Sequence, residues 1–156
     1  GVQTCALPIS EINTDAFAGI TEITVFAPDH PRLLALITGA CAAAGGNIIG
    51  AHIFTTTDGM ALDTILVTRE FKSDDDEARR AKRMCESIRR VLHGQVRLRE
   101  ELDRVQQMPD RARAFSVVPR VVVDNASSNK NTVVEISGMD RVGLLHALTM
   151  LFSISA

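Results

Sequence analysis

Residues 21–46 read TEITVFAPDHPRLLALITGACAAAGG, and this stretch decides the fold. Its first part, residues 21–26, is rich in β-branched side chains and predicts a buried strand. Two prolines then stop the strand, and Asp29 between strand and helix is expected to act as the N-cap. Residues 33–44 repeat apolar side chains at helical spacing. The glycines at 45–46 end this helix, because glycine adopts the left-handed conformation without a Cβ clash.

Two β-rich runs follow, residues 47–56 and 60–69, and Thr57-Asp58-Gly59 joins them. Asp-Gly between two such runs is a strong signal for a β-hairpin. An acidic start at residues 73–77 and an apolar stripe of Ala81, Met84, Ile88 and Val91 predict a long helix that runs on through Leu92. We interpret the many basic side chains of this helix as its solvated face.

Residues 95–107 predict a further short helix, and residues 120–124 predict a last strand that completes the first sheet. The order of elements is then β-α-β-β-α-β, with an extra helix before the last strand. This is the ferredoxin-like plan of the α+β class, in which two helices cover one face of a four-stranded antiparallel sheet.

The chain contains an internal repeat, because residues 133–152 restate residues 23–41 at an offset of 111 residues. We therefore expect one complete module, followed by the first strand and helix of a second. The positions that coincide are Asp29 with Asp140, Leu33-Leu34 with Leu144-Leu145, and Thr38 with Thr149.

Residues 140–145, DRVGLL, resemble the D-R-x-G-L-L signature of ACT domains, which sense small molecules in many amino-acid and nitrogen enzymes. Residues 51–64, AHIFTTTDGMALDT, are similar to the first ACT hairpin of the enzymes that add UMP to the PII nitrogen-signalling protein and remove it. Residues 119–125 resemble the bridge between the two ACT domains of those enzymes. The resemblance covers residues 21–152 and implies a C-terminal region of tandem ACT domains.

This resemblance also implies a partner and an effector. A region of this kind is expected to read glutamine, and to act on PII through the parent enzyme. The catalytic domains of that family are separate and are expected to need Mg²⁺, and their metal-binding motifs are missing from this sequence. We therefore expect no catalytic residue, metal or cofactor in this chain. ACT domains commonly pair with one another, so pairing between copies is a further expectation.

A small amino acid needs backbone donors close to it, and the turn between the first strand and the helix of each copy supplies them. In the second copy this turn holds a glycine that would let a ligand approach the backbone, whereas Arg32 stands at the equivalent position of the first copy. We therefore expect the effector site mainly in the second copy, with helix capping as the alternative role for both aspartates. The candidate effector-binding residues are Asp140, Arg141, Val142, Gly143 and Leu144, together with Asp29 and His30.

The ends of the sequence suggest a piece of a longer protein. Residues 1–10 have no periodicity, and we interpret them as a non-native start. Residues 21–124 are expected to form the first ACT domain, with its extra helix near 95–107. A linker at 125–131 then leads to a truncated second ACT domain at 132–156, which stops inside a predicted helix.

The composition bears on the binding partners and on the cellular setting of the chain. The chain has 156 residues and a net charge of −2 from mixed signs, which does not favour binding to nucleic acid or to an anionic membrane. Three widely spaced cysteines, no signal peptide and no apolar membrane span favour a reducing, cytoplasmic setting. Two alternatives stay open: an ACT domain of another enzyme of amino-acid metabolism, and an RNA-binding domain of the same element order. The absence of Trp and Tyr disfavours RNA binding.

Overall fold

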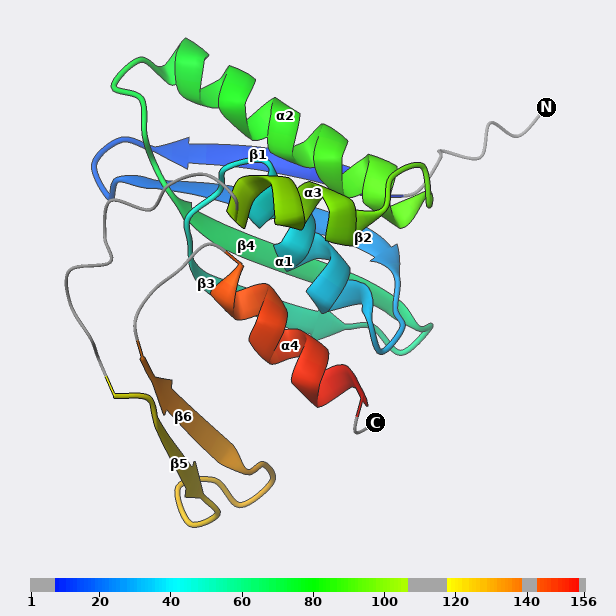
Figure 1. Ribbon diagram of the computed structural model, residues 1–156, viewed down its shortest axis with the longest axis vertical. Helices are drawn as coiled ribbons and strands as arrows, with labels where there is room; N and C mark the ends of the chain where they lie inside the picture. Colours follow the sequence, from blue (N-terminus) through cyan, green and yellow to red (C-terminus); the bar gives the residue numbers. More distant parts are fainter. Residues whose placement is uncertain (1–7, 107–117, 139–142, 155–156) are drawn as a thin grey trace. The chain divides into compact units, whose positions relative to one another are not determined.

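The computed structural model describes residues 8–106, 118–138 and 143–154. The chain divides into two compact units, one formed by residues 1–107 with 142–156 and the other by residues 108–141. In the described residues, the larger unit contains a four-stranded sheet with four helices, and the smaller unit contains a two-stranded sheet (Figure 1).

The sheet of the larger unit has the strand order β1-β2-β4-β3, and each neighbouring pair is antiparallel. Its strands are β1 (Ile9–Asp15), β2 (Ile20–Pro28), β3 (Ile48–Thr55) and β4 (Met60–Thr68). Burial alternates along β2 and β4, so that only one face of the sheet builds the core. The buried residues of β2 are Thr21, Ile23, Val25 and Ala27.

Four helices accompany this sheet: α1 (Leu33–Ala43), α2 (Asp74–Leu92), α3 (Leu98–Gln106) and α4 (Leu144–Ile154). α1 carries no charged side chain and is buried along most of its length, as expected of a helix that is covered on several sides. α2 packs against α1 and turns one apolar stripe to the core. The fully buried side chains of the core include Ile23, Ile37, Ile65, Met84 and Ile88.

A buried carboxylate fixes the start of α2 against the sheet. Glu77 is 0% exposed and accepts hydrogen bonds from Thr21 Oγ1 at 2.8 Å and from the backbone N–H groups of Glu70 and Phe71 at 3.1 Å. Burial raises the pKa of Glu77, but these hydrogen bonds and the charge of Arg80 outweigh it, so that the pKa lies below its usual value. The carboxylate is therefore ionised and fully partnered at neutral pH.

Arg80 is the cationic partner of this carboxylate. Its Nη1 lies 2.8 Å from Glu77 Oε1, and the same guanidinium donates to the carbonyl oxygens of Thr68 at 3.1 Å and Gly45 at 3.2 Å. Nε of Arg80 also lies 3.0 Å from Glu70 Oε2. Because these partners come from α2, the end of β4 and the residues after α1, the ion pair joins three elements of the larger unit.

The predicted fold class is confirmed: the chain is an α+β protein with an antiparallel sheet whose core face is covered by helices. The predicted hairpin is present as β3 and β4, and Gly59 in its turn has φ +79°, a conformation that favours glycine. Ser73 caps α2 by accepting a hydrogen bond from Asp76 N at 3.4 Å, and four acidic residues follow in the first turn.

The prediction that residues 120–124 form the last strand of the first sheet is wrong. β5 (Arg120–Asp124) pairs antiparallel with β6 (Val133–Ser137) and forms the two-stranded sheet of the smaller unit. The position beside β2 is taken by β1, where no strand is expected from the sequence pattern. Strands 9–15 and 20–28 are close in sequence, so pairing them costs less loop-closure entropy than bringing residues 120–124 to β2.

The β1–β2 connection shows how local this pairing is. Asp15 Oδ1 accepts hydrogen bonds from Phe17 N at 2.8 Å and Ala18 N at 3.0 Å, and Gly19 has φ +67°. Ile9 and Ser10 fall within the residues that we interpret as a non-native start, yet they pair with β2 in this register. The linker predicted at residues 125–131 and the domain boundaries around it stay a prediction.

α4 packs against α1 within the larger unit. His146 Nδ1 lies 2.5 Å from the carbonyl oxygen of Ala35, and Thr149 Oγ1 lies 3.5 Å from Thr38 Oγ1. Among the described residues, no helix combines the length and the apolar character needed to cross a membrane.

Candidate effector site

The turn of the first copy lies between β2 and α1 and contains Asp29 and His30. The structure corrects the predicted N-cap, because α1 begins at Leu33 with Arg32 as its N-cap residue and no side chain caps it. Asp29 lies three residues earlier, where its Oδ2 accepts from Thr55 Oγ1 at 3.5 Å and its backbone N–H donates to Gly59 O at 2.9 Å. Asp29 therefore joins the turn to the β3–β4 hairpin.

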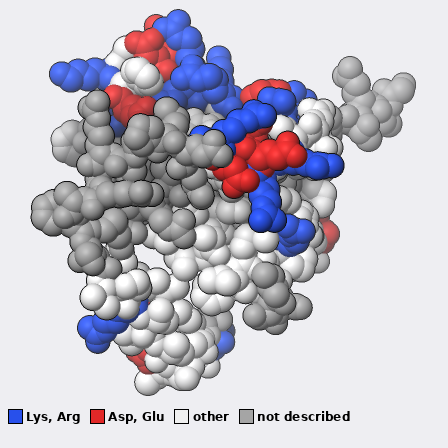
Figure 2. Space-filling view, in the orientation of Figure 1, with Lys and Arg blue, Asp and Glu red and all other residues white. Residues whose placement is uncertain are grey.

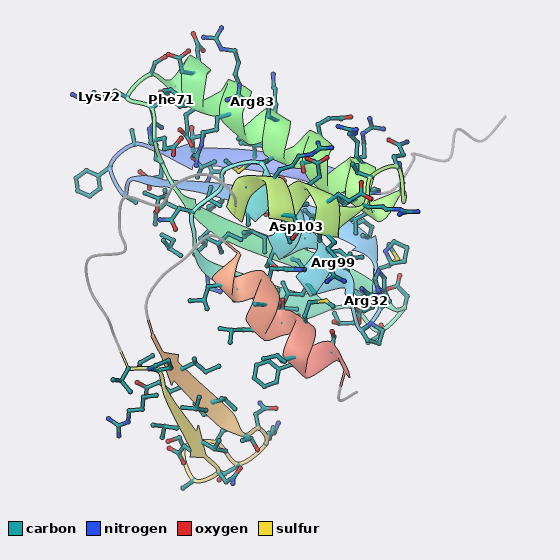
Figure 3. The ribbon with its side chains drawn as sticks, viewed as in Figure 1. Arg32, Phe71, Lys72, Arg83, Arg99 and Asp103 are labelled. Atoms are coloured by element: carbon teal, nitrogen blue, oxygen red, sulfur yellow. The ribbon has the colours of Figure 1, made fainter. Side chains whose placement is uncertain are left out.

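His30 accepts hydrogen bonds from two backbone N–H groups of this turn. The backbone N–H of Arg32 donates to His30 Nδ1 at 3.3 Å, and the backbone N–H of Leu33 donates to His30 O at 3.0 Å. Arg32 itself has φ −100° and ψ −1°, in the right-handed region, and it lies at the N-terminal end of α1 in Figure 3. These two donors are thus already used within the protein and are not available to the carboxylate of a ligand.

The turn of the second copy has a different backbone. Gly143 has φ +76°, which L side chains rarely adopt, and its carbonyl oxygen accepts from Ala147 N at 2.9 Å. A Cβ added at Gly143 would lie 3.7 Å from Leu102 Cδ2, an ordinary contact, so the backbone angle and not the available space requires glycine. Leu144 begins α4.

The remaining candidate residues of the second copy, Asp140, Arg141 and Val142, lie outside the described residues. Of the sequence-predicted residues, the structure therefore describes Asp29 and His30 in the first copy, and Gly143 and Leu144 in the second. The two turns have different neighbours, since Asp29 contacts Thr55 of β3 whereas Gly143 lies beside Leu102 of α3.

Sequence reasoning missed Asp63, a buried carboxylate of β4 close to the first turn. Asp63 is 2% exposed, and its Oδ1 has no hydrogen-bond partner. Burial, and then the charge of Asp29, raises the pKa of Asp63 to about 6. The signal was present in the sequence, because period-2 alternation in β4 sets Asp63 on the same face as Ala61, Ile65 and Val67.

Other titratable groups in the described part of the chain include Cys41 within the core and His146 on α4. No group of three or more His, Cys, Asp and Glu side chains is placed there to hold a metal ion. Burial raises the pKa of the Cys41 thiol to about 12, with a smaller contribution from Cys85, so Cys41 is not a nucleophile at neutral pH. His146 Nδ1 lies against the carbonyl oxygen of Ala35 in the α1–α4 contact.

The charge distribution bears on the RNA alternative. Phe26 and Phe54 lie on the open face of the sheet, on either side of Leu62 in the strand register, so aromatic rings are present there. However, strands β1 to β4 contain no Lys or Arg that could neutralise phosphates on this face. On the face drawn in Figure 2, Asp and Glu lie among the Lys and Arg side chains over α2 and α3.

Comparison with known proteins gives the class of protein first. Residues 21–83, which include β2, α1, β3, β4 and the first part of α2, match the ACT domain family. The chain thus contains an ACT domain.

Comparison over most of the chain identifies a particular relative. Over 142 residues the chain is 50% identical to the bifunctional uridylyltransferase/uridylyl-removing enzyme of Nitrobacter hamburgensis. The match covers 91% of this chain and 15% of that protein, so the chain spans a small part of its relative's length. No solved structure matches the chain.

Proposed function

We propose that this chain is the amino-acid-sensing, regulatory region of a uridylyltransferase/uridylyl-removing enzyme, and that its effector is glutamine. Through that parent enzyme it would control the modification of PII in nitrogen metabolism, in the cytoplasm. The region senses and does not catalyse, since UMP transfer and removal belong to other, Mg²⁺-dependent domains. The ACT domain at residues 21–83 and the 50% identity to a named enzyme of this kind support the proposal.

The backbone of Gly143 carries the proposal. A left-handed glycine directly before α4 lets a small ligand approach the first turn of a helix, whose backbone N–H groups have no partners within the helix. A helix N-terminus favours a carboxylate through these N–H groups and the helix dipole. The α-carboxylate of an amino acid is a ligand of this kind, and this supports the second copy as the effector site.

The first copy takes a structural role in this proposal. At the position equivalent to Gly143 it has Arg32, whose backbone is in the right-handed region. His30 accepts the hydrogen bonds of the backbone N–H groups of Arg32 and Leu33. A ligand carboxylate at this turn would have to displace His30. The difference between the copies therefore favours one effector site in the second copy over two equivalent sites.

Calorimetric titration of the intact enzyme with L-glutamine tests the proposal. L-glutamate is the control for the side-chain amide, and L-asparagine is the control for the length of the side chain. We expect saturable binding of L-glutamine and at least about tenfold weaker binding of both controls. The absence of saturable glutamine binding would overturn the proposal. In a separate assay with PII, UTP and Mg²⁺, this 156-residue chain alone should transfer no UMP.

A further inference from the structure

Two contacts between α1 and α4 join residues that occupy the same position in the two copies. Thr38 and Thr149 are 111 residues apart, and so are Ala35 and His146. This separation equals the offset of the sequence repeat. In a two-fold symmetric pair, a residue meets its own equivalent only close to the symmetry axis. The contacts therefore indicate a local two-fold axis that passes near Thr38 and Thr149.

The side chains around this axis are smaller on α1 than on α4. On α1 the positions on either side of Thr38 are Ala35 and Gly39, both buried. The equivalent positions on α4 are the larger His146 and Met150. A Cβ added at Gly39 would lie 2.5 Å from Leu98 Cδ2 of α3 and 2.7 Å from His146 Nδ1 of α4, so these two side chains together fill the space that the missing side chain leaves on α1.

We propose that the face of α1 formed by Ala35, Thr38 and Gly39 is shaped for α4 of the same chain, and that it selects this partner over α1 of a second chain. An α1–α1 pair about the same axis would set Ala35 and Gly39 opposite each other and leave a void, which costs free energy. An α4–α4 pair would set His146 against Met150 and overfill the contact. Only the mixed pair combines a small face with a large one.

This inference goes beyond effector sensing, because it concerns how the two copies recognise each other. Neither helix contains Lys, Arg, Asp or Glu, so ion pairs between such residues cannot choose the partner. Shape has to make the choice, and the substitutions between the repeats provide it. The copies have therefore diverged at positions 35/146 and 39/150 while keeping threonine at the axis.

Cysteine cross-linking of the full chain tests the proposal. The background carries Cys5→Ser, Cys85→Ser and Cys41→Ala, because Cys41 lies one helical turn from Thr38 and would compete for a cysteine placed there. In the double variant Thr38→Cys/Thr149→Cys, diamide oxidation should link the two cysteines within one chain, seen as monomer mass and a joined peptide. The single variant Thr38→Cys should form no covalent dimer. A covalent dimer of the single variant, or no link within the chain of the double variant, would overturn the proposal.

A measurement on the unsubstituted chain avoids any effect of these changes on folding. In a uniformly ¹³C-labelled sample, methyl NOEs should connect Thr38 with Thr149. In a mixture of labelled and unlabelled chains, isotope filtering retains only NOEs between chains, and this Thr38–Thr149 signal should vanish. A filtered NOE between Thr38 methyl groups of two chains would instead show that α1 pairs with itself.

Discussion

Thr38 of α1 and Thr149 of α4 face each other, with 3.5 Å between their hydroxyl oxygens. Each hydroxyl also donates to a carbonyl oxygen of its own helix, Thr38 to Leu34 at 2.9 Å and Thr149 to Leu145 at 2.9 Å. The two residues thus repeat the same local bonding in both copies. This shared position locates the contact between the copies.

Gly39→Ala should loosen α4 without unfolding the core. The new Cβ would lie 2.5 Å from Leu98 Cδ2 and 2.7 Å from His146 Nδ1, so both side chains must move away. Alanine also gains about 1 kcal/mol of helix propensity over glycine, which offsets part of the loss. By hydrogen exchange we expect roughly tenfold lower protection in α4 and little change in β2. Gly138→Ala, which meets nothing within 4 Å, is the control and should leave α4 unchanged.

Asp63→Asn should stabilise the protein above pH 6. The pKa of Asp63 is raised in the folded protein from 3.8 to about 6, so the folded state binds its proton more tightly than the unfolded state. The contribution of Asp63 to stability therefore falls as pH rises from about 4 to about 6, by about 3 kcal/mol for a shift of this size. Urea unfolding at several pH values should show that the stability of Asp63→Asn, relative to that of the original chain, rises by this amount over the same interval.

The exposed Asp103→Asn is the matched control for this substitution, and it should keep the pH dependence of the original chain. Asp103 lies on α3 and is labelled in Figure 3. An Asp63→Asn variant that is as pH-dependent as the control would show that Asp63 ionises normally in the folded protein.

Glu77→Ala should be strongly destabilising. It removes the partner of Arg80, a guanidinium that is only 3% exposed, and leaves Thr21 Oγ1 without its acceptor. Loss of one member of a buried ion pair typically costs about 3 to 5 kcal/mol. Glu86→Ala is the control, because Glu86 forms the same i,i+3 pair with Arg89 on the solvated side of α2. That change should cost far less by urea unfolding, and equal costs for both would contradict the prediction.

Gly143→Val should weaken glutamine binding by the intact enzyme far more than Arg32→Gly does. Valine at φ +76° strains the backbone and also covers the first turn of α4. Arg32 is right-handed and its amide is held by His30, so glycine there opens no new donor. Calorimetry would contradict this choice of copy if Gly143→Val bound glutamine normally and Asp29→Ala, still folded, did not.

The amides of β6 should exchange faster than those of β2. β5 and β6 form a two-stranded sheet in which Val133 is 42% exposed and Val134 38% exposed, whereas Ile23 is 0% exposed. A two-stranded sheet with so little apolar burial is marginally stable in water. Equal protection of residues 133–136 and 23–25 in hydrogen exchange would contradict this prediction.

The sequence by itself determined the local elements. Asp58-Gly59 between two β-rich runs fixed the β3–β4 hairpin, because the turn needs the positive φ that Gly59 adopts. The acidic start and apolar stripe of residues 73–92 likewise fixed α2, and the repeated residues around Asp29 and Asp140 indicated two related copies. These signals are short-range, so they can be read from neighbouring residues alone.

Only the tertiary structure decided which strand lies beside β2, and which turn amides are already bonded. Residues 120–124 have strong strand propensity, but propensity does not determine which strand they pair with. β1, which is nearer to β2 in the sequence, pairs with that edge of the sheet. Likewise, Asp29 has the right residue type to cap a helix, yet the path of the turn gives the amides of Arg32 and Leu33 to His30. Pairing and burial depend on contacts between distant residues, which the sequence pattern does not specify.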